Sequence, residues 1–85
     1  MPNQQGQSVG TIAHFFNKIG VAVVELTDAL KMGDSIKVVG KNTDFEQVVD
    51  SMEMDKQKIE TAEAGSLVGL KINQKAKEGS RVFKL

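Results

Sequence analysis

The sequence is organised in short runs of alternating apolar and polar residues, separated by turns that contain glycine. A period of two is typical of β-strands with one buried face, and valine and isoleucine dominate these runs. The first two runs, 8–16 and 21–26, flank the tetrapeptide 17–20. Because Asn17 suits the first position of a turn and Gly20 the left-handed position after it, we expect a hairpin with a glycine bulge.

The alternation also predicts which side chains of this hairpin share a face, and one face of each strand should meet the core. In the first run, Ile12, His14 and Phe16 are expected on one face and Val9, Thr11, Ala13 and Phe15 on the other. In the second run, Ala22, Val24 and Leu26 are expected opposite Val21, Val23 and Glu25.

The rest of the chain shows the same organisation. A turn at 30–34, in the sequence Leu-Lys-Met-Gly-Asp, should lead into further strands at 35–39, 45–54, 66–72 and 81–85. The run 45–54 breaks strict alternation, which predicts a bulge near Val48 and Val49. The segment 56–64 has mixed periodicity, compatible with a short helical turn that ends at Gly65.

Six short strands with glycine at the corners predict an all-β fold. We expect a small closed six-stranded antiparallel barrel of Greek-key-like topology, because closure removes exposed sheet edges. A length of 85 residues allows one domain. Residues 1–7 are polar and carry no apolar anchor, so we expect them to form a disordered tail that precedes a single domain at 8–85.

Composition narrows the environment and the chemistry. The chain has no cysteine, which excludes disulfides and thiolate metal sites. No apolar run approaches the roughly 20 residues that cross a bilayer, and the first residues lack the pattern of a secretory signal. We therefore expect a soluble cytoplasmic protein that does not interact with a membrane.

The charges cancel in total but not along the chain. Eleven basic and eleven acidic side chains give no net field that would favour nucleic acid. Acidic residues predominate in 44–63, whereas basic residues predominate in 71–85. Two interpretations follow: ordinary solvated strand faces, or a dipolar module whose basic end meets phosphates.

The residues for catalysis are sparse. A hydrolase or transferase needs a nucleophile, a base and an orienting group, yet the chain has one histidine and neither cysteine nor tyrosine. His14 lies within a predicted strand and is expected to be structural, and no partner ligands are spaced to form a zinc site with it. No phosphate-binding loop of the G-x-x-x-x-G-K-S/T type occurs. We expect no enzymatic activity, no cofactor, no metal and no nucleotide binding.

Several short motifs resemble a known family when they are taken in order. These are Gly10-Thr11-Ile12, the run 30–36, Ser51-Met52, the run 64–70 (Ala-Gly-Ser-Leu-Val-Gly-Leu) and Glu78-Gly79-Ser80. Over 8–85 the chain resembles the second, β-barrel domain of translational GTPases such as elongation factor Tu and initiation factor two. It is similar above all to the small proteins called translation elongation factor-like, which consist of that barrel alone. A similar barrel also ends some collagenase-like peptidases that act in tRNA modification.

The resemblance implies a non-enzymatic binding module in translation or RNA metabolism, with tRNA or a ribonucleoprotein as its partner. The candidate nucleic-acid-binding residues are the basic side chains Lys71, Lys75, Lys77 and Arg81. The alternative is an accessory domain that interacts with a separately encoded peptidase-like tRNA-modifying enzyme.

For that alternative, the candidate contacts surround the first hairpin: Phe15, Phe16, Lys18 and Ile19. A structural reading of Phe15 and Phe16 remains open, in which the two straddle the sheet with one in the core and one over a barrel end.

Overall fold

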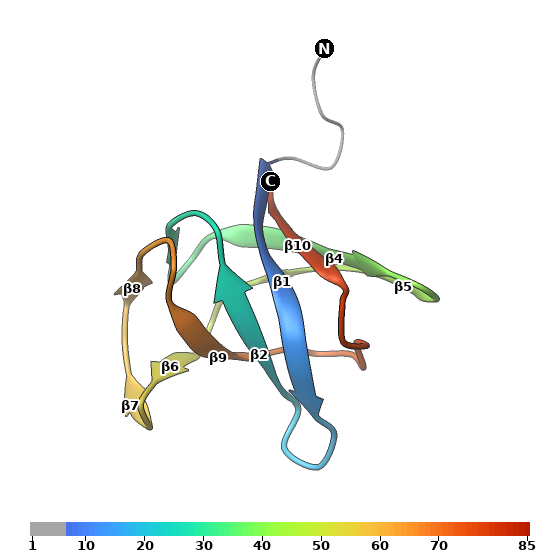
Figure 1. The fold of residues 1–85 in the computed structure, drawn as a ribbon, viewed down its shortest axis with the longest axis horizontal. Helices are drawn as coiled ribbons and strands as arrows, with labels where there is room; N and C mark the ends of the chain where they lie inside the picture. Colours follow the sequence, from blue (N-terminus) through green and yellow to red (C-terminus); the bar gives the residue numbers. More distant parts are fainter. Residues whose placement is uncertain (1–6) are drawn as a thin grey trace.

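The computed structural model describes residues 7–85, and over this range the chain consists of β-strands and loops. Eight strands form one antiparallel sheet in the order β5-β4-β10-β1-β2-β9-β6-β7, and the remaining two, β3 and β8, form a separate pair (Figure 1). The strands are β1 (Gln7–Phe16), β2 (Val21–Leu26), β3 (Leu30–Lys31), β4 (Ser35–Gly40), β5 (Thr43–Val48), β6 (Met52–Met54), β7 (Gln57–Lys58), β8 (Thr61–Ala62), β9 (Leu67–Lys71) and β10 (Arg81–Lys84).

The all-β antiparallel class predicted from the sequence is confirmed, but the closed six-stranded, Greek-key-like barrel is not found. In the described residues, β5 and β7 stand at the two ends of the sheet order, and no strand pairing joins them. The reason lies in 43–58, which divides into three short strands with different neighbours instead of one long strand. β5 pairs with β4, whereas β6 pairs with β9 and with β7.

The side chain of Gln47 links β5 to the end of β9 and the loop that follows it. The Gln47 amide nitrogen donates to the Lys71 carbonyl oxygen at 2.9 Å, and the backbone N–H of Asn73 donates to the Gln47 amide oxygen at 2.8 Å. Gln47 is buried, so both bonds form with little competition from water. The amide thus makes the kind of paired hydrogen bonds that a neighbouring strand would make.

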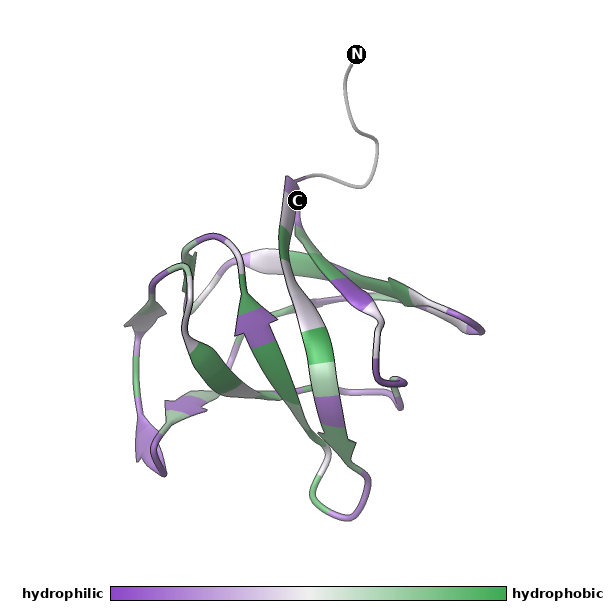
Figure 2. Cartoon of the chain, viewed as in Figure 1, coloured by the Kyte–Doolittle hydropathy of each residue, from purple (hydrophilic) through white to green (hydrophobic). Residues whose placement is uncertain are grey.

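The core lies between the inward faces of the curved sheet and receives residues from most strands. Alternating positions of β2 and β9 are buried, as predicted, and Figure 2 shows hydrophobic residues concentrated in these two strands. The largest of the fully buried side chains are Val9, Ile12, Val24, Leu26, Leu30, Ile36, Val38, Val49, Met52, Val68, Leu70 and Val82. This packing fixes which face of β1, β2, β9 and β6 remains outside.

β1 changes face at a bulge, which the sequence did not indicate. The pairing of β1 with β2 shifts between Ile12 and His14, so Ala13 is the extra residue. Ile12 therefore points into the core, while His14 and Phe16 lie outside with ring centroids 4.5 Å apart. The prediction that Ile12, His14 and Phe16 share one face is wrong for this reason.

The predicted turns are confirmed at their critical residues. Gly20 has φ 68° and its N–H donates to the Phe16 carbonyl at 2.9 Å, which closes the first hairpin. In the 30–34 turn, Gly33 has φ 92° and the Asp34 carboxylate accepts the Lys31 N–H at 3.0 Å. These residues supply the left-handed backbone and the acceptor that such turns require.

Three other local predictions need correction. The predicted strand 45–54 is interrupted after Val48, because Val49 is buried and pairs with Gly33 and Asp34 while the chain moves on to β9. The segment 56–64 contains β7 and β8 and no helical turn. Of the predicted tail, residues 1–6 lie outside the described residues, whereas Gln7 already belongs to β1 and pairs with Lys84.

The β6–β7 hairpin carries backbone strain that a substitution should relieve. Its two-residue loop has φ 54° at Asp55 and 65° at Lys56, although such turns favour glycine at the second position. Lys56→Gly should therefore raise the free energy of unfolding by about 0.5–1 kcal/mol. Urea unfolding of the two proteins measures this difference, and an equal or lower midpoint for the glycine variant would contradict it.

Candidate functional site

The outer face of β1, β2, β9 and β6 presents side chains in rows across the strands. One row runs from Phe16 through Val21 to Lys71. The next runs from His14 through Val23 and Gly69 to Glu53. Opposite residues in adjacent strands lie about 5 Å apart, so the side chains within each row lie next to one another. The absence of a side chain at Gly69 leaves a gap in the second row.

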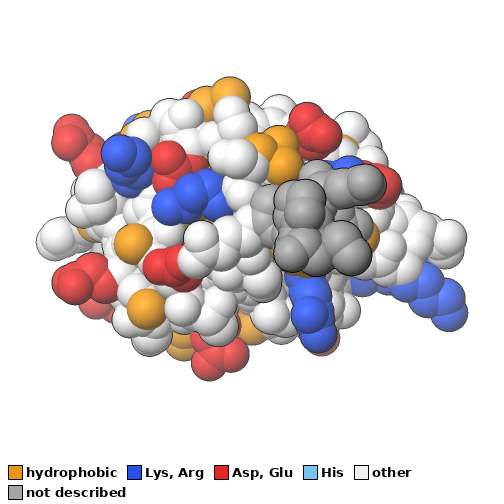
Figure 3. Space-filling model, turned by 90° about the horizontal axis from the view of Figure 1, so that it is seen from above, with side chains coloured by type: hydrophobic (Ala, Val, Ile, Leu, Met, Phe, Trp, Pro, Cys, Tyr) orange, Lys and Arg blue, Asp and Glu red, His pale blue; other side chains and the backbone are white. Residues whose placement is uncertain are grey.

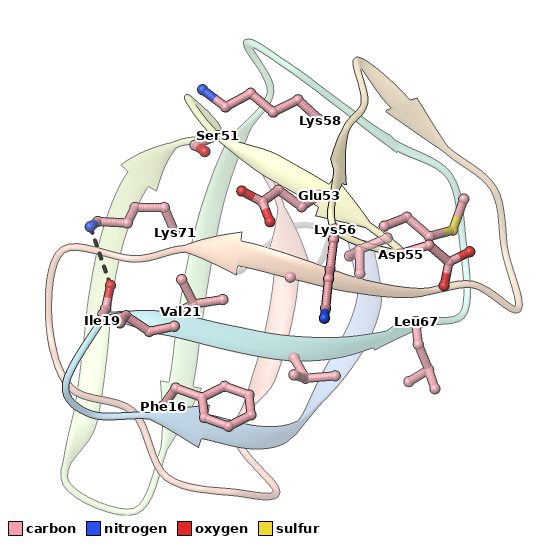
Figure 4. Close-up of a pocket in the computed structure, with 14 residues that line it drawn as sticks. Phe16, Ile19, Val21, Ser51, Glu53, Asp55, Lys56, Lys58, Leu67 and Lys71 are labelled. Carbon is pink, nitrogen blue, oxygen red and sulfur yellow. Dashed lines mark hydrogen bonds between the residues drawn. The ribbon is translucent and has the colours of Figure 1, made fainter.

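A hollow of about 680 Å³ lies on this outer face, and we call it the outer groove (Figure 4). The chain turn after β1 and the β6–β7 hairpin border it, so its walls come from segments far apart in the sequence. Its lining residues are Phe16, Ile19, Val21, Val23, Ser51, Glu53, Met54, Asp55, Lys56, Lys58, Leu67, Val68, Gly69 and Lys71.

Large apolar side chains around the groove are unusually exposed. Phe16 is 46% exposed, Ile19 58% and Leu67 56%. A small domain gains no stability from leaving three such side chains in water around one hollow. Clustered exposure of this kind is typical of a surface that meets another molecule.

Charged side chains of both signs surround the apolar floor. Figure 4 shows Glu53, Asp55 and Lys58 on the side of the β6–β7 hairpin and Lys71 at the opposite end beside Ile19. The Lys71 ammonium donates to the Ile19 carbonyl at 3.2 Å. The groove therefore combines an apolar centre with a polar rim, as protein-binding surfaces commonly do.

A second hollow, of about 590 Å³, lies beside the loop that precedes β10. It is lined by Phe15, Asn17, Asn42, Thr43, Lys75, Ala76, Lys77 and Glu78. The Glu78 carboxylate also contacts Nδ1 of His14 at 2.8 Å. His14 is half exposed on the outer face and contacts Glu78, so it is a surface residue.

The four basic residues predicted to bind nucleic acid do not form one patch. Lys75 and Lys77 line the second hollow together, whereas Lys71 lines the outer groove. Arg81 lies exposed on β10 and lines neither hollow. On the face seen in Figure 3, basic and acidic side chains occur side by side, so this face carries no field of a single sign.

The hairpin residues predicted to contact a partner also divide. Phe16 and Ile19 line the outer groove, whereas Phe15 packs against the core and lines the second hollow. Lys18 is exposed at the hairpin tip and lines neither hollow. The structural reading of the two phenylalanines is thus correct for Phe15, which supports the core, while Phe16 faces outward.

Sequence reasoning missed the residues that β9 and β6 add to the groove, notably Leu67, Gly69 and Glu53. A signal for two of them was present, because placing Val68, Leu70 and Ile72 inside puts Leu67 and Gly69 outside. What no sequence pattern revealed was that β6 would pair with β9 and bring its hairpin to the same face.

No group of three or more histidine, cysteine, aspartate or glutamate side chains in 7–85 is arranged to hold a metal ion. Residues 7–85 contain no helix that is long and apolar enough to cross a membrane.

Comparison with known proteins points away from translation factors. No protein-family model matches the chain. Over 78 residues, 91% of the chain, it is 41% identical to the uncharacterized protease MJ0090 of Methanocaldococcus jannaschii. The chain spans only 19% of the length of that protease.

Solved structures identify the fold. The C-terminal domain of a putative U32 peptidase from Geobacillus thermoleovorans superposes with a TM-score of 0.86 over 100% of this chain and 98% of that domain, at 16% identity. Its selenomethionine variant gives a TM-score of 0.87 over 92% of this chain and 99% of that domain, at 17% identity.

These matches overturn the assignment to the translation elongation factor-like proteins and, with it, the prediction of a translation-related, RNA-binding module. The short glycine motifs that suggested it specify turns, which unrelated β-proteins also need. The chain has the fold of the C-terminal domain of a putative U32 peptidase, and its sequence is similar to one fifth of an uncharacterized protease.

Proposed function

We propose that this chain is a non-enzymatic accessory domain that binds the peptidase part of a U32 peptidase-like protein. The observation that carries the proposal is the 41% identity to a segment of a protease of which this chain spans 19%. The remaining four fifths of such a protein offers a large surface for the domain to dock on. The solved domain with the same fold is itself one part of a putative peptidase.

The outer groove is the surface that best suits this docking. It gathers Phe16, Ile19 and Leu67, all about half exposed, around one hollow. About half of each side chain is still exposed, so burying the rest against a partner contributes about 1 kcal/mol per residue, and several such residues together favour a complex. The polar rim then supplies orientation and specificity.

The composition supports a role without catalysis. The single histidine lies half exposed on β1 and bonds to Glu78 on the surface. The chain has no cysteine or tyrosine to act with it. Catalysis would then belong to the peptidase part, and this domain would position or stabilise it.

Copurification tests the proposal. The chain carries an affinity tag, and the probe is the Methanocaldococcus jannaschii protease without its matching 78-residue segment. After nuclease treatment, the wild-type chain should retain the protease. Failure to retain a truncated protease that is folded by circular dichroism would contradict the proposed function.

A matched pair of variants locates the surface. Leu67→Asp places a charge in the outer groove, whereas Val48→Asp places one at an equally exposed apolar position on β5 outside it. Loss of one buried leucine should weaken binding at least about tenfold in the first variant. The second should bind as the wild type does. Equal binding by both variants in a titration would exclude the outer groove as the docking surface.

A further inference from the structure

Gly69 stands apart from the other glycines of the described residues. Four of them, Gly20, Gly33, Gly65 and Gly79, have φ between 68° and 92°, a left-handed backbone that disfavours other residues. Two more are hemmed in, because an added Cβ would lie 2.8 Å from the Glu25 carbonyl oxygen at Gly10 and 2.2 Å from the Ser80 hydroxyl at Gly40.

Gly69 has no left-handed backbone, and its surroundings are less crowded than those of Gly10 and Gly40. An added Cβ there would meet only Val21 Cγ1 at 3.3 Å and the Glu53 carbonyl oxygen at 3.9 Å. Val21 is only partly buried, so its methyl group has room to give way. Glycine within a strand costs about 0.5–1 kcal/mol relative to alanine. The fold therefore does not require glycine at position 69.

The effect of Gly69 appears on the outer face. It pairs with Val23 on one side and Glu53 on the other, in the middle of β9 and in the lining of the outer groove. Side chains that follow the same alternation rise at Leu67 and Lys71, one at each end. The missing side chain leaves a notch over β9, bounded by Val23, Glu53, Leu67 and Lys71, which we call the Gly69 notch.

The rim indicates what enters the notch. Three lysines, Lys56, Lys58 and Lys71, and two acidic residues, Glu53 and Asp55, line the outer groove. Within 7–85 none of these five groups forms an ion pair, and Figure 4 shows Lys56 pointing across β9 toward β2. The excess of positive charge around an apolar floor favours an aliphatic side chain that has an acidic neighbour.

We propose that the Gly69 notch receives an aliphatic side chain of the peptidase-like partner, with an adjacent acidic residue meeting the rim lysines. This inference rests on the proposed function and names the position that determines specificity. Glycine at position 69 keeps the notch open for binding, although it makes β9 slightly less stable than alanine would.

Titration calorimetry tests the notch. The probe is again the Methanocaldococcus jannaschii protease without its matching segment, and the variants are Gly69→Ala and Gly69→Val, with Ala64→Val as a control that adds bulk at an exposed residue outside the groove. Kd should rise about tenfold for Gly69→Ala and about a hundredfold for Gly69→Val. The control should leave Kd unchanged, and Gly69→Ala should unfold at the wild-type temperature or above it.

A photo-cross-linking residue in place of Val23 then identifies the partner segment that lies in the notch. Mass spectrometry should find it attached to a segment in which an aliphatic residue neighbours aspartate or glutamate, and attachment to a segment without such a pair would overturn the proposal.

The possible failures of the titration are distinguishable. If the wild type binds and folded Gly69→Ala binds equally well, the notch is wrong and the proposed function stands. If the wild type does not bind, both fail.

Discussion

Replacing Gln47 with leucine is expected to lower the free energy of unfolding by about 2–3 kcal/mol, because the substitution removes two part-buried hydrogen bonds and leaves two backbone groups without these partners. These groups are the Lys71 carbonyl, which accepts from the Gln47 amide, and the Asn73 N–H, which donates to it. The melting temperature should fall by roughly 10–20 °C in a domain of this size. Thermal and urea unfolding monitored by circular dichroism measure both quantities.

Gln57→Leu provides the matched control. Gln57 lies exposed on β7, so the same replacement there should change the free energy of unfolding by less than about 0.5 kcal/mol. If both variants unfold together with the wild type, the Gln47 amide does not hold β5 to the chain after β9.

Gly40→Ala should cost about 2–3 kcal/mol through overpacking. A Cβ on Gly40 would lie 2.2 Å from the Ser80 hydroxyl oxygen and 2.9 Å from its Cβ. Ser80 is buried, so β4 and the loop before β10 have to separate to make room. Urea unfolding of the variant measures the loss.

The Ser80 side chain supplies the control for this prediction. Its hydroxyl is buried and has no hydrogen-bond partner in the described residues, so Ser80→Ala alone should be neutral or slightly stabilising. Gly40→Ala combined with Ser80→Gly should recover about 1 kcal/mol or more relative to the sum of the single changes. Strict additivity would show that the two residues do not clash.

The strands of the first hairpin and of β9 could be predicted because local pattern decides them. Val68 and Leu70 alternate with exposed neighbours, and Gly20 terminates the turn in the left-handed region where glycine was expected. The bulge at Ala13 could not be predicted, since alanine is accepted on either face of a strand. That one extra residue moved His14 and Phe16 to the outer face.

The sheet is not closed into the predicted barrel because strand pairing depends on long-range partners that no local pattern encodes. The run 45–54 reads as one irregular strand, yet Val49 bonds to the turn at Gly33 and Asp34 while Met52 pairs with Leu70. The assignment of the family failed for a related reason. In the 30–34 turn, Leu30 is buried, Gly33 takes the left-handed conformation and the Asp34 carboxylate accepts a hydrogen bond. Many β-turns need residues of these kinds, whatever the function of the protein.

Only part of the outer groove could be predicted from the sequence. Phe16 and Ile19 were identified as apolar residues near a hairpin tip, and both line the outer groove. Leu67 and Gly69 followed from the alternation of β9, but their importance emerged only when β6 and its hairpin were placed beside them. The basic residues were grouped by sequence proximity, and the fold separated Lys71 from Lys75 and Lys77.

A competition experiment tests whether this chain binds the peptidase part of the protease. The chain is titrated into the Methanocaldococcus jannaschii protease lacking the 78 residues that it matches, and the excised 78-residue segment is then added in excess. We expect a saturable complex of one chain per protease, from which the segment displaces the chain. The absence of a complex, or a complex that the segment does not displace, would contradict the proposed function.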